Sequence, residues 1–331
     1  METKNTFWKI FNKESRIEGH ISKGFDQSIF NSYCWDLHLK NQGWKSYIWK
    51  NNSNNNDESY VKTYIKFYPF KIGIVWIPGG IIGKTENINT LKKSICTELN
   101  IQHCYLRVRC NIEDGIKEEI NFLKNKWKKP IINLNSHYTM LLDIEPDLDV
   151  IYSQFSRNWK RSIRKSIINK ISYKKINNPN EIAKVYKQMR EIKSLKHNEV
   201  FTKELIKSII NSFKENIIIF GAFNSHKKLL AIRGAIIYGE KALDIFAAST
   251  KEGKSLAVSN GLFLKLIEEC KKNNCNLYDL NGIDPEKNMG VFLFKKGTGA
   301  RIVKTIGEYE SSTNHFLSLL INLFILIKKN I

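Results

Sequence analysis

Two adjacent lysines, Lys295 and Lys296, lie between a phenylalanine-rich turn and two closely spaced glycines, Gly297 and Gly299. Glycine lets the backbone adopt conformations that other residues avoid and lets a ligand approach it closely. A lysine ammonium at such a place can bind a phosphate, or it can stabilise the oxyanion that forms when an amine attacks an ester. The sequence therefore predicts a phosphate or oxyanion site here.

These lysines belong to a longer pattern that starts with a buried strand and ends with an alternating strand. It closely resembles the C-terminal signature of the Fem family, the non-ribosomal aminoacyltransferases that build peptidoglycan cross-bridges. The matching residues are Tyr278, Asp279, Gly282, Gly290, Phe294, Lys295, Gly297, Gly299, Gly307 and Glu308. Asn281 departs from the family pattern by replacing a glycine, and Thr298 departs from it by replacing an aromatic residue.

The resemblance implies that Lys295 stabilises the oxyanion or holds an acceptor phosphate, since family members carry a functional lysine there. Asp279, at the end of a strand, would accept or hold the amine proton; alternatively, it caps the Asn281-Gly282 turn. Tyr278, Lys296, Gly297 and Gly299 are expected in the substrate-binding surface. Aminoacyl transfer needs little more, because the donor is an activated ester and the acceptor is a primary amine.

A second group of residues is strongly basic. The segment 157–196 carries 13 basic and two acidic residues. A helix is predicted over residues 147–169, and five of its basic residues share one face and repel each other unless an anion neutralises them. They are Arg157, Lys160, Arg161, Arg164 and Lys165. The stretch FSRNWKRSIRKS also resembles a Fem motif, (K/W)-x-R-x-x-I-R-K-A. We expect phosphate binding here; the alternative is a solvated basic face.

In the first half of the chain, a strand runs into Pro78-Gly79-Gly80. This resembles the YIPRGP turn that lies beside the substrate cleft in the Fem family. Gly79 stands in place of the family's arginine and Ile81 in place of its second proline, so a charge contact is lost. Gly79 and Gly80 are expected to line the substrate site; a tight turn with a structural role alone is the alternative.

The composition limits the partners. The chain of 331 residues is 42% hydrophobic and carries a net charge of +21, which indicates a globular protein with a polyanionic partner. No C-x-x-C pair occurs among the six cysteines and the histidines are scattered, so we expect reduced thiols and no metal. The first residues lack the apolar core of a secretion signal, which favours a cytoplasmic protein.

The expected elements position these residues in a mixed α/β (α+β) fold. In each half, three antiparallel strands precede a helix and a further strand, which is the order of GNAT acyltransferases. On the analogy with the Fem family, we expect two tandem GNAT-like domains. They would span residues 1–145 and 146–312, followed by an apolar tail helix over 313–331. In the second half, Val258, Leu262, Leu266 and Cys270 predict the buried stripe of a helix over 256–274.

The tail is the most apolar segment. Residues 316–331 are almost uninterruptedly apolar until Lys328-Lys329. The segment is shorter than the roughly twenty residues that span a bilayer. Two expectations stay open: a helix lying in the inner face of an anionic membrane, or a helix docked on the protein itself or on a partner.

The donor is expected to be aminoacyl-tRNA. The pyrophosphate loop of GNAT enzymes would need suitable residues at Thr250, Gly253 and Ser255, and only the glycine fits. We therefore expect no CoA and no other cofactor. The acceptor would be an amine of a peptidoglycan precursor or a related envelope glycan, modified by a peripheral protein at the inner membrane face. The alternatives are an acyl-CoA-dependent N-acyltransferase of amino sugars in surface polysaccharide, and a non-catalytic protein that binds RNA or membrane.

Overall fold

A computed structural model describes residues 8–11, 28–51, 58–83, 88–113, 115–193 and 201–330. Most of the asparagine-rich loop expected at residues 51–59 lies outside these ranges, as do the side chains of Lys328 and Lys329. The chain forms two compact units. One comprises Met1–His137 and Lys304–Asn330, and the other comprises Tyr138–Val303. The boundaries at residues 145 and 312, as limits of independently folding domains, stay predictions.

The first unit is built on a sheet whose neighbouring strands are antiparallel except for the parallel pair β4 and β6. In spatial order the strands are β1 (Trp8–Ile10), β2 (Lys45–Asn51), β3 (Ser59–Tyr68), β4 (Ile72–Ile77), β6 (His103–Glu113) and β13 (Arg301–Ser312), and the short β5 (Ile81–Ile82) pairs with β3. The helices are η1 (Ile29–Asn31), α2 (Tyr33–Lys40), α3 (Ile88–Glu98), α4 (Ile116–Lys124) and α12 (His315–Asn330).

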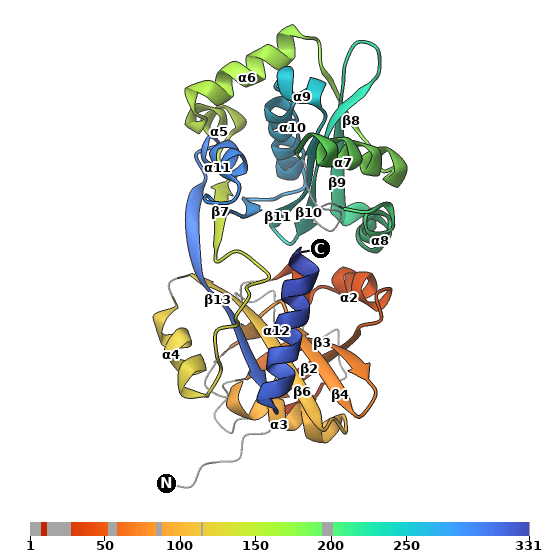
Figure 1. The fold of residues 1–331 in the computed structure, drawn as a ribbon. Coiled ribbons are helices and arrows are strands. Elements are labelled where there is room, and N and C mark those ends of the chain that lie inside the picture. Colours follow the sequence, from red (N-terminus) through yellow and green to blue (C-terminus); the bar gives the residue numbers. More distant parts are fainter. Residues whose placement is uncertain are drawn as a thin grey trace. The chain divides into compact units, whose positions relative to one another are not determined.

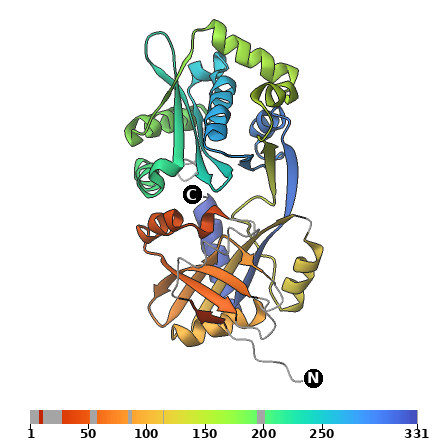
Figure 2. The same ribbon diagram turned by 180° about the vertical axis from the view of Figure 1, so that it is seen from behind.

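The core of the first unit joins this sheet to α3 and α4. Leu91 and Ile95 of α3 and Phe122 of α4 are fully buried in one apolar cluster with strand residues such as Val75 and Leu106. Helix α12 packs against β6, and Figures 1 and 2 show it along one face of this sheet. The last segment of the chain is therefore anchored on the unit that contains the first.

The second unit repeats the arrangement, with antiparallel neighbours except for the parallel pair β11 and β12. In spatial order its strands are β8 (Ser172–Lys175), β9 (Ile217–Phe223), β10 (Leu229–Tyr238), β11 (Lys241–Ser249), β12 (Leu277–Gly282) and β7 (Tyr138–Asp143). The helices are α5 (Leu148–Gln154), α6 (Arg157–Ile168), α7 (Pro179–Lys193), α8 (Lys203–Phe213), η4 (Lys214–Asn216), α9 (Lys251–Ser255), α10 (Val258–Lys272) and α11 (Met289–Lys296).

Helix α10 is the central helix of the second unit and packs against β9, β10 and α6 (Figure 1). The predicted stripe of Val258, Leu262, Leu266 and Cys270 is confirmed, since each of these side chains is at most 1% exposed. In both units, three antiparallel strands lead into a helix and then into a strand parallel to the third, so the expected GNAT-like order is confirmed twice.

The long basic helix predicted over residues 147–169 is wrong as a single element. It consists of α5 and α6, separated by Phe155 and Ser156 in extended conformations. The side chain of Ser156 accepts a hydrogen bond from the backbone N–H of Trp159. A serine that satisfies one of the first unpaired N–H groups of a helix favours a new start at that point.

Candidate functional site

Lys295 lies in the last turn of α11 and its side chain is buried, with 7% exposed. Its ammonium donates hydrogen bonds to two backbone carbonyls, to Asn281 O at 3.1 Å and to Gly282 O at 2.7 Å. Asn288 is the N-cap of helix α11, and its side chain accepts a hydrogen bond from the backbone N–H of Val291. The helix thus directs the lysine at the turn that ends β12.

That turn is rigidly built. Asn281 adopts a left-handed conformation with φ of 67°, which asparagine tolerates better than most residues. Asp279 Oδ1 accepts hydrogen bonds from Asn281 N at 2.7 Å and from Thr139 Oγ1 at 2.6 Å. These contacts match the turn-capping alternative for Asp279. Its expected role with the amine proton stays a prediction.

A buried ion pair of the second unit acts electrostatically on Lys295. Arg233 of β10 and Asp244 of β11 form an ion pair in which both side chains are 6% exposed. Tyr278 is fully buried, and its hydroxyl donates to Asp244 Oδ1 at 3.0 Å. Tyr278 thus belongs to the interior network and presents no surface to a substrate. The guanidinium of Arg233 lies 4.9 Å from the rings of Phe263 and Phe294.

The surroundings lower the pKa of Lys295 to about 8. Burial is the principal cause because it disfavours the ammonium, while the carboxylate of Asp244 opposes it by favouring the charged form. Burial also raises the pKa of Asp244, against the effect of Arg233. A lysine with a pKa close to neutral pH exchanges protons in the physiological range, which is a common property of functional sites.

The glycines after Lys295 allow α5 and α6 to pack closely on this loop. A Cβ atom on Gly297 would lie 2.1 Å from Cδ1 of Trp159, and on Gly299, with φ of 80°, it would lie 3.1 Å from Gln154. The indole of Trp159 donates to Phe294 O at 2.8 Å, and Ser156 N donates to Gly297 O at 2.9 Å. The two regions that the sequence singled out in the second half are therefore in direct contact.

Thr298 occupies the position where the family pattern has an aromatic residue. Its side chain is fully buried, and its hydroxyl donates to Lys295 O at 2.6 Å. The hydroxyl also accepts from Ala300 N at 3.2 Å. Thr298 thus closes the loop through hydrogen bonds. Lys296, by contrast, is exposed and lies 5.8 Å from the ring of Phe292.

Helix α6 presents its charge to solvent. Trp159, Ile163 and Ser166 form its buried side. The exposed basic residues are Arg157, Arg161, Arg164 and Lys165. Lys160 is half-buried and donates to Ser153 O at 2.7 Å, so it also ties α6 to α5. The helix thus offers a basic face on a firmly packed base, and phosphate binding by that face stays a prediction.

In the first unit, the Pro78-Gly79-Gly80 turn follows β4. A Cβ atom on Gly79 would lie 2.0 Å from the side-chain oxygen of Asn31, and Gly80 has φ of 74°. Both glycines are required for packing or for backbone conformation, which agrees with the structural alternative. Their expected contact with substrate stays a prediction.

The end of the Fem-like pattern has a structural role in the first unit. Gly307 has φ of 83°, and a Cβ atom there would lie 1.9 Å from Nδ1 of His137. Glu308 forms a buried ion pair with Arg107 and accepts a hydrogen bond from Leu134 N at 2.8 Å. These residues fix β13 on the segment that precedes the second unit in the chain.

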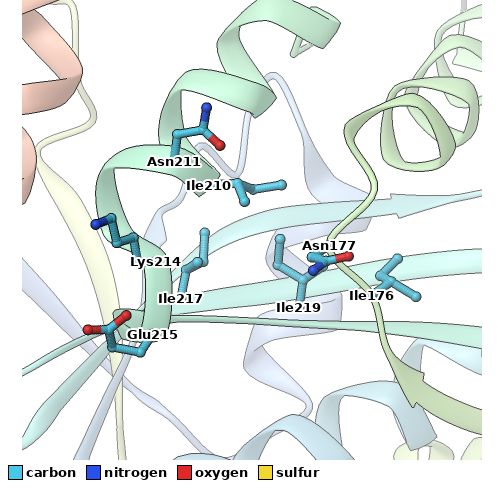
Figure 3. Close-up of a pocket in the computed structure, with 8 residues that line it drawn as sticks. All are labelled: Ile176, Asn177, Ile210, Asn211, Lys214, Glu215, Ile217 and Ile219. Carbon is cyan, nitrogen blue, oxygen red and sulfur yellow. The ribbon is translucent and has the colours of Figure 1, made fainter.

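A surface pocket of about 490 Å³ lies beside α8 and β9 in the second unit (Figure 3). Four isoleucines and four polar residues line it: Ile176, Asn177, Ile210, Asn211, Lys214, Glu215, Ile217 and Ile219. None of these is a residue that the sequence singled out for chemistry. Lys214 and Glu215, which carry its charges, are exposed.

Neither a metal site nor a membrane span is found in the described part of the chain. No group of three or more His, Cys, Asp or Glu side chains within those ranges is placed to hold an ion. None of the described helices combines the length and the hydropathy needed to cross a bilayer.

Arg233, Asp244 and Thr139 are site residues that sequence reasoning missed. A signal was present for two of them, because Arg233 and Asp244 interrupt otherwise apolar strands. A bulge in the pairing of β10 and β11 between Gly234 and Ala235 brings Asp244 opposite Ala235. No local pattern predicts this shift in register.

Two solved structures are similar to this chain in fold. A tandem GNAT protein from the clavulanic acid biosynthesis pathway matches with a TM-score of 0.57 and 9% identity, over 94% of this chain and 99% of that one. L-PGS from Bacillus licheniformis matches with a TM-score of 0.53 and 10% identity, over 95% and 97%. The fold is therefore a tandem GNAT-like fold.

Two further matches concern the Fem family. FemX superposes with a TM-score of 0.77 and 13% identity, over 95% of this chain and 100% of that one. Residues 168–325 match the FemAB family model, which confirms the Fem resemblance over the segment that contains Lys295. Comparison with curated protein sequences gives no significant match. The family model thus covers slightly less than half of the chain, and the superposition on FemX shows a shared fold.

Proposed function

We propose that this protein transfers an aminoacyl group from aminoacyl-tRNA to an amine of a peptidoglycan precursor or related envelope glycan, forming an amide bond. The observation that carries the proposal is Lys295, a buried lysine with a lowered pKa in the last turn of α11, within the segment that matches the FemAB family model. The expected location at the inner face of the membrane stays a prediction.

The chemistry requires few groups. The acceptor nitrogen attacks the ester carbonyl, and the carbonyl oxygen becomes an oxyanion. The tRNA hydroxyl then leaves with the electron pair of the broken C–O bond and takes a proton that the amine has lost. A lysine ammonium has three N–H donors. Two of those of Lys295 bind Asn281 O and Gly282 O, and the third can donate to the oxyanion or to an acceptor phosphate.

The remaining predicted residues have supporting roles. Arg161 and Arg164 would bind phosphates of the tRNA or of the acceptor, since guanidinium groups pair with phosphate bidentately. Lys296, Gly297 and Gly299 would line the approach to Lys295. Asp279 would hold the acceptor amine through the carboxylate that already orders the turn.

The segment around Gly253, where a GNAT enzyme would hold the CoA pyrophosphate, favours tRNA over acyl-CoA as the donor. Gly253 N, which would donate to a pyrophosphate oxygen, donates instead to Thr250 Oγ1 at 3.0 Å. A Cβ atom on Gly253 would lie 2.4 Å from Leu230 O, so this backbone is tightly packed. The amide-forming alternative with acyl-CoA would need this loop to open.

A donor comparison tests the proposal. The purified protein is incubated with a soluble UDP-linked muropeptide and either charged tRNA or a set of acyl-CoAs. The mass of the muropeptide is then measured by mass spectrometry. We expect a gain of one aminoacyl residue with charged tRNA alone. A gain of an acyl group from CoA would establish the alternative transferase, and no gain with either donor would favour the non-catalytic alternative.

A further inference from the structure

The C-terminal helix α12 turns its polar side chains toward the first unit. Ser318 and Asn322 are the only polar residues between Phe316 and Ile327, and both bind Glu310 of β13. Ser318 Oγ lies 2.7 Å from Glu310 Oε1, and Asn322 Nδ2 lies 2.9 Å from Glu310 Oε2. Asn322 is only 2% exposed.

Most of the apolar side chains of α12 consequently face away from the unit, while Leu317, Ile321 and Ile325 are partly buried. Seven of them are between 42% and 64% exposed: Phe316, Leu319, Leu320, Leu323, Phe324, Leu326 and Ile327. A surface helix of a globular protein normally turns its apolar stripe inward. Here the buried carboxylate of Glu310, which also accepts from Tyr105 OH at 2.8 Å, requires hydrogen-bond donors and so draws the polar side of the helix inward.

We propose that this outward face of α12 binds the surface of an anionic lipid bilayer. The twelve residues 316–327 contain no charged side chain, and Lys328-Lys329 follow them in the sequence. The helix has 16 residues, fewer than the roughly twenty that span a bilayer. It therefore lies in the plane of the interface, with its exposed apolar side chains among the acyl chains.

Charge favours lipid over a second copy of this chain as the occupant. Each copy carries a net charge of +21, so two copies repel each other, whereas an anionic membrane attracts each of them. The exposed face also has no charged residue that would fix the register of a protein partner. A fluid layer of acyl chains can cover such a face without pairing particular side chains.

Vesicle binding tests this proposal without the transferase reaction, so its result is independent of the proposed activity. The full chain and the variant F316S/L323S/I327S are sedimented with phosphatidylglycerol–phosphatidylcholine vesicles and with neutral vesicles. The matched control is I116S/I120S/L123S, which removes three exposed apolar side chains of α4 in the same unit.

We expect the wild type and the α4 variant to sediment with anionic vesicles and the α12 variant to lose at least about tenfold in partitioning. Equal binding by all three proteins would overturn the proposal. The proposal would also be overturned if the wild type did not bind vesicles but formed a dimer, detected by light scattering, that the α12 variant did not form.

A second measurement uses the wild type alone and so does not depend on the folding of a variant. A lipid with a photoactivatable group in its acyl chain is included in the vesicles, and the labelled peptides are mapped by mass spectrometry. Label in residues 316–327 supports the insertion of α12. The absence of label in these residues would refute the insertion of α12 into the bilayer.

Discussion

The pH dependence of the reaction gives the sharpest test of Lys295. If its ammonium stabilises the oxyanion, Lys295→Met should lower turnover by about 100- to 1000-fold at pH 7, the usual range for removal of one such donor. With a pKa of about 8, Lys295 is about nine-tenths protonated at pH 7 and about one-tenth protonated at pH 9. The advantage of the wild type should therefore shrink about tenfold between these pH values.

The assay measures single-turnover product formation with a soluble acceptor at a series of pH values, normalised to the aminoacyl-tRNA that survives hydrolysis. Titration of the acceptor amine affects both proteins equally, so it cancels in the ratio of wild type to variant. A ratio that does not change from pH 7 to pH 9 would refute the role of the ammonium.

The matched control for this experiment is Lys271→Met. Lys271 also donates to backbone carbonyls in the second unit, those of Ile144, Glu145 and Pro146 at 2.6 to 2.8 Å. It therefore has the same kind of structural contact as Lys295 and lies outside the predicted site. Loss of turnover in both variants would mean that the effect of Lys295→Met is only structural.

Three further predictions follow from the same contacts. The folded protein binds the Lys295 proton less tightly than the unfolded chain. The free energy of unfolding of the wild type, relative to that of Lys295→Met, should therefore rise by up to roughly 3 kcal/mol as pH increases from about 8 toward 10.5. Chemical unfolding at several pH values measures this difference, and a difference that does not change with pH would contradict the prediction. Gly297→Ala should destabilise the second unit by about 1–3 kcal/mol because the new Cβ atom meets Trp159. Gly290→Ala should not, because a Cβ atom there has nothing within 4 Å. Thermal melts compare the two variants, and equal melting temperatures would refute the packing argument. Replacing Arg161 and Arg164 by Gln should weaken tRNA or precursor binding and reduce the slope of log affinity against log salt concentration by about one to two units. The control replaces the exposed pair Lys203 and Lys207 of α8 by Gln. Equal slopes for the two variants would identify the face of α6 as solvated surface.

The sequence predicted the elements best where a strong period or a clear turn marked them. The helix stripe from Val258 to Cys270 was readable because apolar residues recur there every four positions. The break at Ser156 was missed, since a serine inside a strongly basic helical pattern is as compatible with a surface position as with a cap.

The site could be predicted only in part. Lys295 and the glycines that follow it form a local pattern, and the structure buries Lys295 and Gly297 at the end of α11. The ion pair of Arg233 and Asp244 depends on the register between two strands and on a bulge. The contact of α12 with Glu310 depends on the pairing of β13 with β6. Paired residues of these two strands are about 200 positions apart in the sequence. Neither arrangement is a local property of the chain.

The most direct test of the account is the transfer of a labelled aminoacyl group from tRNA to a muropeptide, with the modified amine located by tandem mass spectrometry. The account predicts that the wild type and Lys271→Met form the labelled amide at comparable rates and that Lys295→Met forms it at least about 100-fold more slowly at pH 7. The absence of labelled amide with the wild type, or its formation at an undiminished rate by folded Lys295→Met, would contradict it.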